Sequence, residues 1–218
     1  MTNLKSNGVF ITATDTGVGK TYVAALIAEE LKKRFRVGVF KPAVTGSLSD
    51  VYKLKRSSGS PLSSDEINPV FFKTPLAPYV ASKLARPRRE IDVGAITRSY
   101  RKVCKSSEFL IVEGAGGLYV PVTKNLFVID LIKKFRLPVI LVVRPKLGTI
   151  NHTLLSLKAL KKRKIVVKAV VMNNHTGRDA AERTNPGVLR ELIDVPLFIV
   201  KKNARGIPSG LIELLVSY

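Results

Sequence analysis

The sequence lacks the features that mark secreted, disulfide-bonded or membrane-spanning proteins. Cys104 is its only cysteine, so the chain can form no internal disulfide and no metal site that needs two cysteines. Its longest apolar run, around Pro138 to Val143, has the length of a strand and not the ~20 residues of a membrane-spanning helix. The polar N-terminal segment, residues 1–8, lacks the apolar core of a signal peptide. These absences predict a cytoplasmic protein with no membrane partner.

Acidic residues are also scarce, since 16 Asp and Glu stand against 37 Lys and Arg, a net charge of +21. Such an excess can indicate binding to nucleic acid or to an acidic surface. The basic clusters, however, mostly fall at predicted helix ends and connections, where cations suit the helix dipole and the solvent. They are Lys32–Arg34, Arg86 with Arg88 and Arg89, Lys133–Lys134 and Lys161–Lys164. They carry no interleaved aromatic residues, and basic composition alone is nonspecific, so a nucleic-acid partner is the less favoured interpretation.

Short apolar segments alternate with longer amphipathic ones along the chain. The strand candidates, several of them apolar throughout as in strands buried on both faces, are Val9–Thr12, Val37–Phe40, Phe109–Glu113, Val139–Val143, Val166–Met172 and Leu197–Val200. The helix candidates are Thr21–Arg34, Asp92–Lys105, Leu126–Phe135 and Asn151–Lys162. This alternation predicts one α/β domain over residues 1–218, with a mainly parallel sheet covered by helices on both faces. The Ser-rich stretch Ser47–Pro69 is expected to be an irregular active-site loop.

The segment ATDTGVGKT, residues 13–21, lies between the first strand candidate and the first helix candidate. Gly17 and Gly19 allow backbone amides to turn toward phosphate oxygens. Lys20 supplies a cation for the β- and γ-phosphates and Thr21 a hydroxyl for Mg²⁺, while the helix N-terminus adds its dipole. The segment predicts a nucleotide-binding loop, but a loop of this kind does not by itself name a reaction.

Three further strand ends carry residues suited to the same site. Glu113 ends an apolar strand before a glycine-rich turn, at the edge of a parallel sheet where site residues collect. Lys41 follows the second strand and adds a second cation, although a solvated lysine in a turn is an equally good interpretation of it alone. The segment KLGTINH, residues 146–152, starts a helix whose N-terminus can bind an anion. Its His152 is more typical of a structural histidine than of a base.

Four segments together resemble the dethiobiotin synthetases, the ATP-dependent carboxylases of biotin synthesis. They are TDTGVGKT (14–21), KPAVTG (41–46), VEGAGGLYVPV (112–122) and LPVILVVRPKLGTINH (137–152), and the resemblance runs from about residue 8 to about residue 175. The family's loop has one residue more than the common pattern, so its first glycine falls at Ala13 and not at Thr14. We expect alanine to be tolerated there if its φ angle is negative. The resemblance implies a doubly wound fold like that of phosphate-loop NTPases, and a homodimer with the site at the subunit interface.

The resemblance also implies a role for each site residue. ATP, the co-substrate, contacts Thr16, Gly17, Val18, Gly19, Lys20, Thr21, Tyr22, Glu113, Gly116 and Asn173, of which Asn173 reads the adenine. Mg²⁺ is held by Thr21, Asp50 and Glu113. The catalytic residues are Lys20, Lys41 and Thr45, with Lys41 stabilising charge between phosphate and carbamate. The substrate is bound by Thr45 and, at its distant carboxylate, by Gly148, Thr149, Ile150 and Asn151 of the partner subunit.

The implied reaction converts 7,8-diaminononanoate, CO₂ and ATP to dethiobiotin, ADP and phosphate through a carbamate and a carbamic-phosphoric anhydride. Two anions meet in the phosphoryl transfer, so clustered cations are needed and no protein nucleophile is. The C-terminal quarter departs from the family, because Pro196–Lys202 runs straight on where the family has a PLLGxIP-like segment over the base. The selectivity for the base therefore stays open.

Two other classes share parts of this pattern. A partition- or septum-site-type ATPase switch would use the positive charge on DNA or membrane, but it predicts a loop lysine where Asp15 and Thr16 stand and an amphipathic tail. The tail Leu211–Tyr218 is short and has no basic face. A glutamine-dependent amidotransferase synthetase would normally bring a glutaminase domain, for which 218 residues leave no room.

Overall fold

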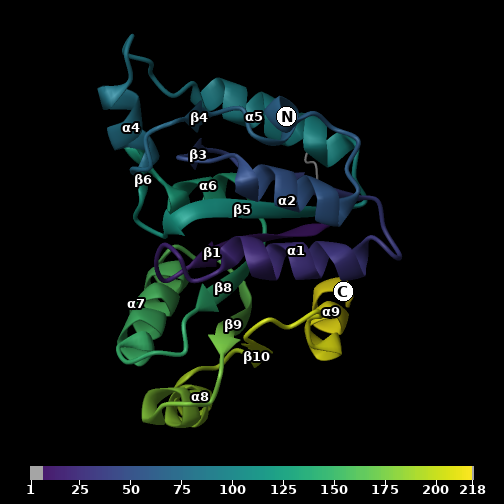
Figure 1. Cartoon of the computed structure of the whole chain (residues 1–218), viewed down its shortest axis with the longest axis vertical. Coiled ribbons are helices and arrows are strands. Elements are labelled where there is room, and N and C mark those ends of the chain that lie inside the picture. Colours follow the sequence, from purple (N-terminus) through teal and green to yellow (C-terminus); the bar gives the residue numbers. More distant parts are fainter. Residues whose placement is uncertain (1–6, 218) are drawn as a thin grey trace.

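Six apolar segments lie side by side in one sheet (Figure 1). In the computed structural model, which describes residues 7–217, they are β1 (Gly8–Ala13), β2 (Val37–Phe40), β5 (Phe109–Gly117), β8 (Val139–Val143), β9 (Val167–His175) and β10 (Leu197–Lys201). Their order is β10-β9-β8-β1-β5-β2, and every neighbouring pair is parallel. The predicted parallel sheet is confirmed. Most of the N-terminal segment that argued against a signal peptide lies outside the described residues.

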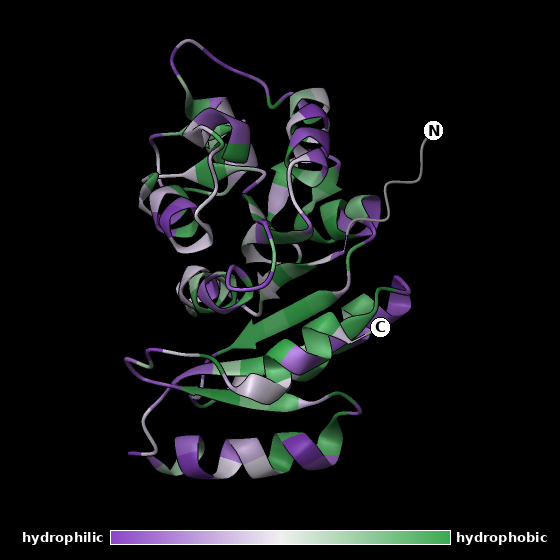
Figure 2. Ribbon diagram, turned by 90° about the vertical axis from the view of Figure 1, so that its right-hand side faces the viewer, coloured by the Kyte–Doolittle hydropathy of each residue, from purple (hydrophilic) through white to green (hydrophobic). Residues whose placement is uncertain are grey.

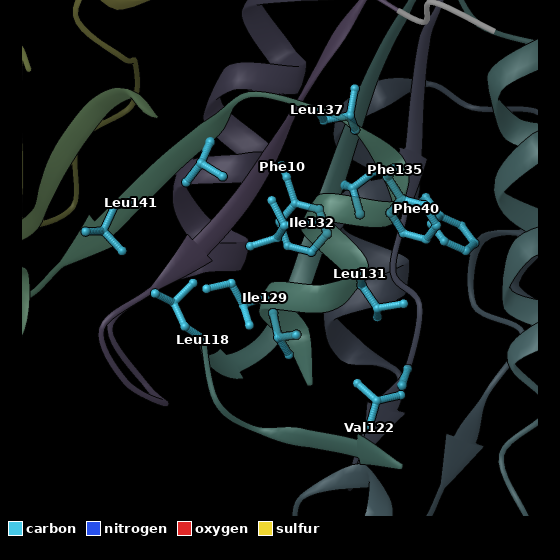
Figure 3. Close-up of a cluster of buried hydrophobic side chains, with 14 of the residues drawn as sticks. Phe10, Phe40, Leu118, Val122, Ile129, Leu131, Ile132, Phe135, Leu137 and Leu141 are labelled. Atoms are coloured by element: carbon cyan, nitrogen blue, oxygen red, sulfur yellow. The ribbon is translucent and has the colours of Figure 1, made fainter. Parts of the chain in front are cut away.

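Helices cover both faces of this sheet, because its strands are apolar on both sides. Phe10 and Val112 point into one core, and Val9 and Ile11 into the other. The first core packs against α5 (Val93–Lys105), α6 (Val128–Phe135), α7 (Thr149–Lys162) and α8 (Ala180–Leu192). The second packs against α1 (Lys20–Leu31), α2 (Ser49–Ser58), α3 (Ser64–Ile67) and α9 (Ser209–Val216). Figure 3 shows part of the first core around α6, and Figure 2 shows strands that are mostly hydrophobic between helices of mixed character. The predicted doubly wound arrangement is confirmed.

The stretch 47–69 is not the irregular loop that the sequence predicts. It contains α2 and α3, and α2 ends at Gly59 in the left-handed conformation. The apolar side chains that α2 buries are only Val51 and Leu54, beside the small Ser57 and Ser58. Such a thin apolar stripe leaves little periodicity to detect, which explains the wrong prediction.

Other elements differ in smaller ways. The predicted helix over 126–135 begins at Val128, because β7 (Leu126–Phe127) pairs with β6 (Pro121–Thr123). The short strands β3 (Val44–Thr45) and β4 (Phe71–Phe72) form a second parallel pair. Neither α4 (Pro78–Leu84) nor α8 is among the predicted helices, and α8 contains Pro186, a residue that usually interrupts a helix.

The carboxyl ends of the parallel strands meet at one edge of the sheet, which is where ligands bind in such folds. The loop between β1 and α1 lies at this edge beside α7 (Figure 1), and the two share the lining of a surface cavity. No helix within residues 7–217 has the length and apolar character needed to cross a bilayer.

Candidate active site

The loop at residues 13–21 takes its shape from two glycines. Gly17 has a φ angle of 71° and Gly19 of 92°, both in the left-handed region that residues with a side chain rarely adopt. Ala13 instead ends β1 and is not among the described residues with positive φ, so alanine fits there as expected. Because α1 begins at Lys20, the unpaired amides of its first turn face the loop. The loop therefore has the backbone of an anion-binding site.

A cavity of about 420 Å³, here named the Lys41 cavity, lies beside this loop. Its lining comes from four segments that are distant in sequence: Thr16, Gly17, Gly19, Lys20, Thr21 and Tyr22; Lys41, Ala43, Val44 and Thr45; Asp50 and Lys53; and Glu113, Gly114, Ala115 and Gly116. The structure thus brings the predicted phosphate, metal and catalytic residues together. Val18 is the exception in the loop, because its side chain is buried in the core and it does not line this cavity.

A buried ion-pair cluster forms the floor of the Lys41 cavity. Lys41 Nζ lies 2.5 Å from Glu113 Oε1 and 3.0 Å from Asp50 Oδ2, and the Lys41 side chain is only 6% exposed. Burial alone would lower the pKa of Lys41, but the two carboxylates outweigh it and raise the pKa above that of an ordinary lysine. Burial likewise opposes ionisation of Asp50, and the charge of Lys41 outweighs it and lowers the pKa of that carboxyl. The interpretation of Lys41 as a solvated lysine is therefore wrong, and Glu113 is buried as well.

Lys20 lines the same cavity, but for this lysine the effect of burial on the pKa outweighs that of the carboxylates. Its Nζ donates to the backbone oxygen of Asp15 at 3.2 Å. Burial lowers the pKa of Lys20 to about 8, and the positive charge of Lys41 adds to this effect while Glu113 opposes it. The charged form of Lys20 is therefore held less strongly than that of an ordinary lysine, and an anionic ligand would raise its pKa again.

The three predicted Mg²⁺ ligands also lie together. Thr21 Oγ1 donates to Glu113 Oε1 at 2.8 Å and is a hydrogen-bond partner of Asp50. Glu113 Oε2 is buried, and no residue of the described range 7–217 hydrogen-bonds to it. Within residues 7–217 no group of three or more His, Cys, Asp or Glu side chains could hold a metal alone. Two carboxylates and a hydroxyl nevertheless fit Mg²⁺, which takes its other oxygen ligands from water and phosphate.

A second cavity of about 330 Å³, here named the Asn173 cavity, shares Gly17, Gly19 and Tyr22 with the first. The buried Asn173 donates from Nδ2 to the backbone oxygen of Val18 at 2.9 Å, while its Oδ1 has no partner. A Cβ atom on Gly19 would lie 2.1 Å from Nδ2, so Asn173 packs directly on the loop. We expected the amide both to donate to a base and to accept from it. The bond to Val18 uses one Nδ2 hydrogen, so within residues 7–217 the amide keeps one donor and its acceptor oxygen unused.

The charged residues that line the Asn173 cavity, here named its rim, are not among the predicted site residues. The rim carries four cations and no carboxylate, from Arg144, Lys146, Lys201 and Lys202. Arg144 Nη2 lies 2.5 Å from Asp15 Oδ2, and Tyr22 donates its hydroxyl hydrogen to the backbone oxygen of Ala204. Their position in the sequence could have indicated a role, because Arg144 directly follows β8 and Lys202 directly follows β10. The carboxyl ends of such parallel strands form the edge of the sheet where site residues collect.

The segment Gly148–Asn151, predicted to bind the distant carboxylate of the substrate, does not line either cavity within one chain. Gly148 starts α7 with a φ angle of 87°, but neither the Lys41 cavity nor the Asn173 cavity is lined by Gly148, Thr149, Ile150 or Asn151. Thr149 is buried, and its Oγ1 has no hydrogen-bond partner among the residues that the structure describes. His152 is exposed on the same turn and lines neither cavity. The preceding residue, Leu147, is 90% exposed.

Comparison with known proteins gives strong sequence matches. A family model described as an AAA domain matches residues 7–200. The ATP-dependent dethiobiotin synthetase BioD of Thermodesulfovibrio yellowstonii is 46% identical, covering 87% of this chain and 85% of that protein. The protein of the same name from Endomicrobium trichonymphae is 39% identical and covers 91% and 94%. These matches extend beyond residue 175, so the expected end of the resemblance was too early.

Solved structures show the same fold at low sequence identity. A plasmid partition protein from Borrelia burgdorferi gives a TM-score of 0.59 at 14% identity, covering 97% of this chain and 99% of that one. The MinC:MinD cell division protein complex of Aquifex aeolicus gives 0.55 at 15% identity, covering 96% and 94%. Identities this low establish the phosphate-loop NTPase-like fold alone and do not support the partition or septum-site alternative. On the sequence matches, the chain belongs to the dethiobiotin synthetase family.

Proposed function

We propose that this protein is an ATP- and Mg²⁺-dependent dethiobiotin synthase acting on 7,8-diaminononanoate and CO₂. Membership of the family supports the activity. The single structural observation that carries it is the cluster of Lys20, Lys41, Asp50 and Glu113 in one cavity beside the loop at residues 13–21. Such a cluster suits a reaction in which negative charge passes between two anions.

The proposed reaction has three bond-forming steps. One amine of the substrate adds to the carbon of CO₂ and loses a proton, which gives a carbamate. A carbamate oxygen then attacks the γ-phosphorus of ATP, the bond to the bridging oxygen breaks, and ADP leaves. The second amine attacks the carbamoyl carbon and loses a proton, and the bond to the phosphate oxygen breaks. The products are dethiobiotin and inorganic phosphate.

Each cluster member has a role in this proposal that follows from its surroundings. Lys41, held charged by its carboxylate partners, faces the place where the carbamate meets the γ-phosphate. Lys20 binds the terminal phosphates, whose negative charge stabilises its ammonium form. Thr45 lines the same cavity and offers its hydroxyl to the reacting end of the substrate. The amides of Gly17, Val18 and Gly19 surround the phosphates.

Mg²⁺ would be held by Thr21, Asp50 and Glu113, since the Thr21 hydroxyl contacts both carboxylates. The unpaired buried oxygen of Glu113 supports this assignment. When bound, the ion neutralises charge on the transferred phosphoryl group. The adenine would occupy the Asn173 cavity, with the side-chain amide of Asn173 donating to the base and accepting from it.

The most direct test incubates the protein with diaminononanoate, ¹³C-bicarbonate, Mg²⁺ and ATP, followed by mass spectrometry. A cyclic urea that carries the label is expected. No product, together with ATP hydrolysis stimulated by DNA or lipid, would instead favour the partition- or septum-type switch. The cytoplasmic location and the lack of nucleic-acid and membrane partners stay predictions.

We further propose a homodimer in which each Gly148–Asn151 segment serves the partner's site. Two observations support it: these residues line no cavity with Lys41 in their own chain, and exposed apolar side chains lie nearby, among them Tyr119, Leu147 and Leu155. Mixing inactive Lys41→Ala and Asn151→Ala subunits should restore about a quarter of wild-type activity, because half the dimers form with one intact site each. No recovery after subunit exchange, or a monomer by light scattering, would contradict it.

A further inference from the structure

The Lys41 cavity contains a third lysine that the proposed function does not use. Lys53 lies on α2 one turn after Asp50, and its half-buried side chain lines the cavity. Its Nζ lies 4.8 Å from the centre of the Tyr22 ring. No carboxylate of residues 7–217 lies within ion-pair distance of Lys53. An aromatic ring is thus the neighbour of this ammonium group.

The charges that line the cavity leave one cation in excess. Asp50 and Glu113 are negative, whereas Lys20, Lys41 and Lys53 are positive. Lys41 contacts both carboxylates, and both also attract Lys20. The contact of Lys53 with the Tyr22 ring is weaker than a charge-assisted hydrogen bond from a lysine to phosphate. A phosphate within reach would therefore replace the Tyr22 ring as the partner of the Lys53 ammonium group.

Tyr22 shows which part of a nucleotide Lys53 would meet. Its side chain borders both the Lys41 cavity and the Asn173 cavity. A nucleotide with its terminal phosphates at Lys20 and its base at Asn173 must pass Tyr22 between them. The part that passes is the phosphate next to the ribose. We propose that Lys53 binds this α-phosphate, exchanging the Tyr22 ring for a phosphate oxygen.

This inference rests on the proposed nucleotide site, and direct binding measurements separate the two. Calorimetry with ADP and ATP in the presence of Mg²⁺ is expected to show affinities about tenfold weaker for Lys53→Met than for wild type. The loss should be equal for the two nucleotides because both carry the α-phosphate. A loss confined to ATP would place Lys53 at the γ-phosphate and overturn the inference.

Two further variants define the role of the charge. Lys53→Arg should keep the affinity, because its guanidinium also binds phosphate, and this outcome excludes a purely structural effect of removing the lysine. Lys55→Met, on the same helix but outside the cavity lining, should bind like wild type. If wild type binds neither nucleotide, the proposed function fails. If wild type binds and Lys53→Met binds equally well, only the inference about Lys53 fails.

Discussion

The Lys41 cavity and the Asn173 cavity meet at Tyr22 but are built in opposite ways. In the first, the buried Lys41 is paired at hydrogen-bonding distance with the buried Glu113 and with the half-buried Asp50. In the second, the cations of the rim are largely exposed, and Lys201 and Lys202 lie at the end of an outer strand. The buried ion pair thus lies in the cavity where the proposed chemistry moves charge, whereas the Arg144–Asp15 pair beside the second cavity is partly exposed.

The difference has a physical cause. A buried charge is costly unless it is paired, and a pair inside the protein is screened little by solvent. The Lys41 cluster is therefore both rigid and sensitive to the loss of one member. The exposed rim cations gain little from any single partner, so their replacement should have small effects. Three experiments test this contrast, from the largest expected effect to the smallest.

Lys41→Met should have the largest effect. Without its ammonium group the rate of product formation should fall by about 1,000-fold or more, because a transition-state charge loses its fixed counter-charge. The variant should also lose about 3–5 kcal/mol of unfolding free energy, since Glu113 is left buried without its partner. Activity assays and urea denaturation measure the two effects separately.

The double variant Lys41→Met/Glu113→Gln is the matched control for stability. It should recover much of the unfolding free energy, because no buried charge remains unpaired, yet stay inactive. Robust turnover in Lys41→Met would show that the cluster is structural and would remove its assigned role.

The second experiment is the pH dependence of nucleotide binding through Lys20. Since burial in the free protein holds the pKa of Lys20 at about 8 and phosphate favours the charged form, affinity should change little up to about pH 7 and fall by about half between pH 7 and pH 8. Above pH 8 it should fall by up to about tenfold per pH unit, because binding then requires uptake of a proton. Lys20→Arg stays charged and should show a flat profile over this range.

The same lowered pKa affects stability with the opposite sign. Between pH 8 and the ordinary lysine value of 10.5 the unfolded chain holds more protons at this position than the folded one. The contribution of Lys20 to the unfolding free energy should therefore rise with pH in this window while nucleotide affinity falls. A pH profile of affinity that is the same for wild type and Lys20→Arg would contradict this assignment.

The smallest expected effect lies in the Asn173 cavity. Asn173→Ala removes the hydrogen bond to the Val18 backbone and the acceptor proposed for the base. ATP should bind about three- to tenfold more weakly, a typical result of losing one neutral hydrogen bond. Tripolyphosphate, which has no base, should lose less. Equal losses for both ligands would mean that Asn173 acts only by shaping the loop.

The sequence predicted the parts of this molecule that depend on local pattern. Apolar, β-branched runs located the strands, and the spacing of Gly17, Gly19 and Lys20 located the loop. The contact between Lys41 and Glu113 is different, because it requires β2 and β5 to be neighbours in the sheet. The order of strands is not written in either segment, and Asp50 was reached only through the family resemblance.

One common reason explains why the sequence did not indicate a role for Lys53, Arg144 and Lys202. Lys53 lies on a helix with too few buried apolar residues to be recognised, and Arg144 and Lys202 follow strands whose position in the sheet was unknown. Each reaches the site by tertiary packing alone. For such residues a single sequence indicates the edge of the sheet but not the partner.

The close approach of Asn173 to Gly19 restricts which substitutions these two positions can accept during evolution. A larger residue at position 19 would need both a smaller one at 173 and a backbone that tolerates a φ angle of 92°. Two substitutions far apart in the gene would have to arise together, and either alone would damage the loop. We therefore expect positions 19 and 173 to co-vary among relatives. A relative with a larger residue at position 19 should have a smaller residue than asparagine at position 173.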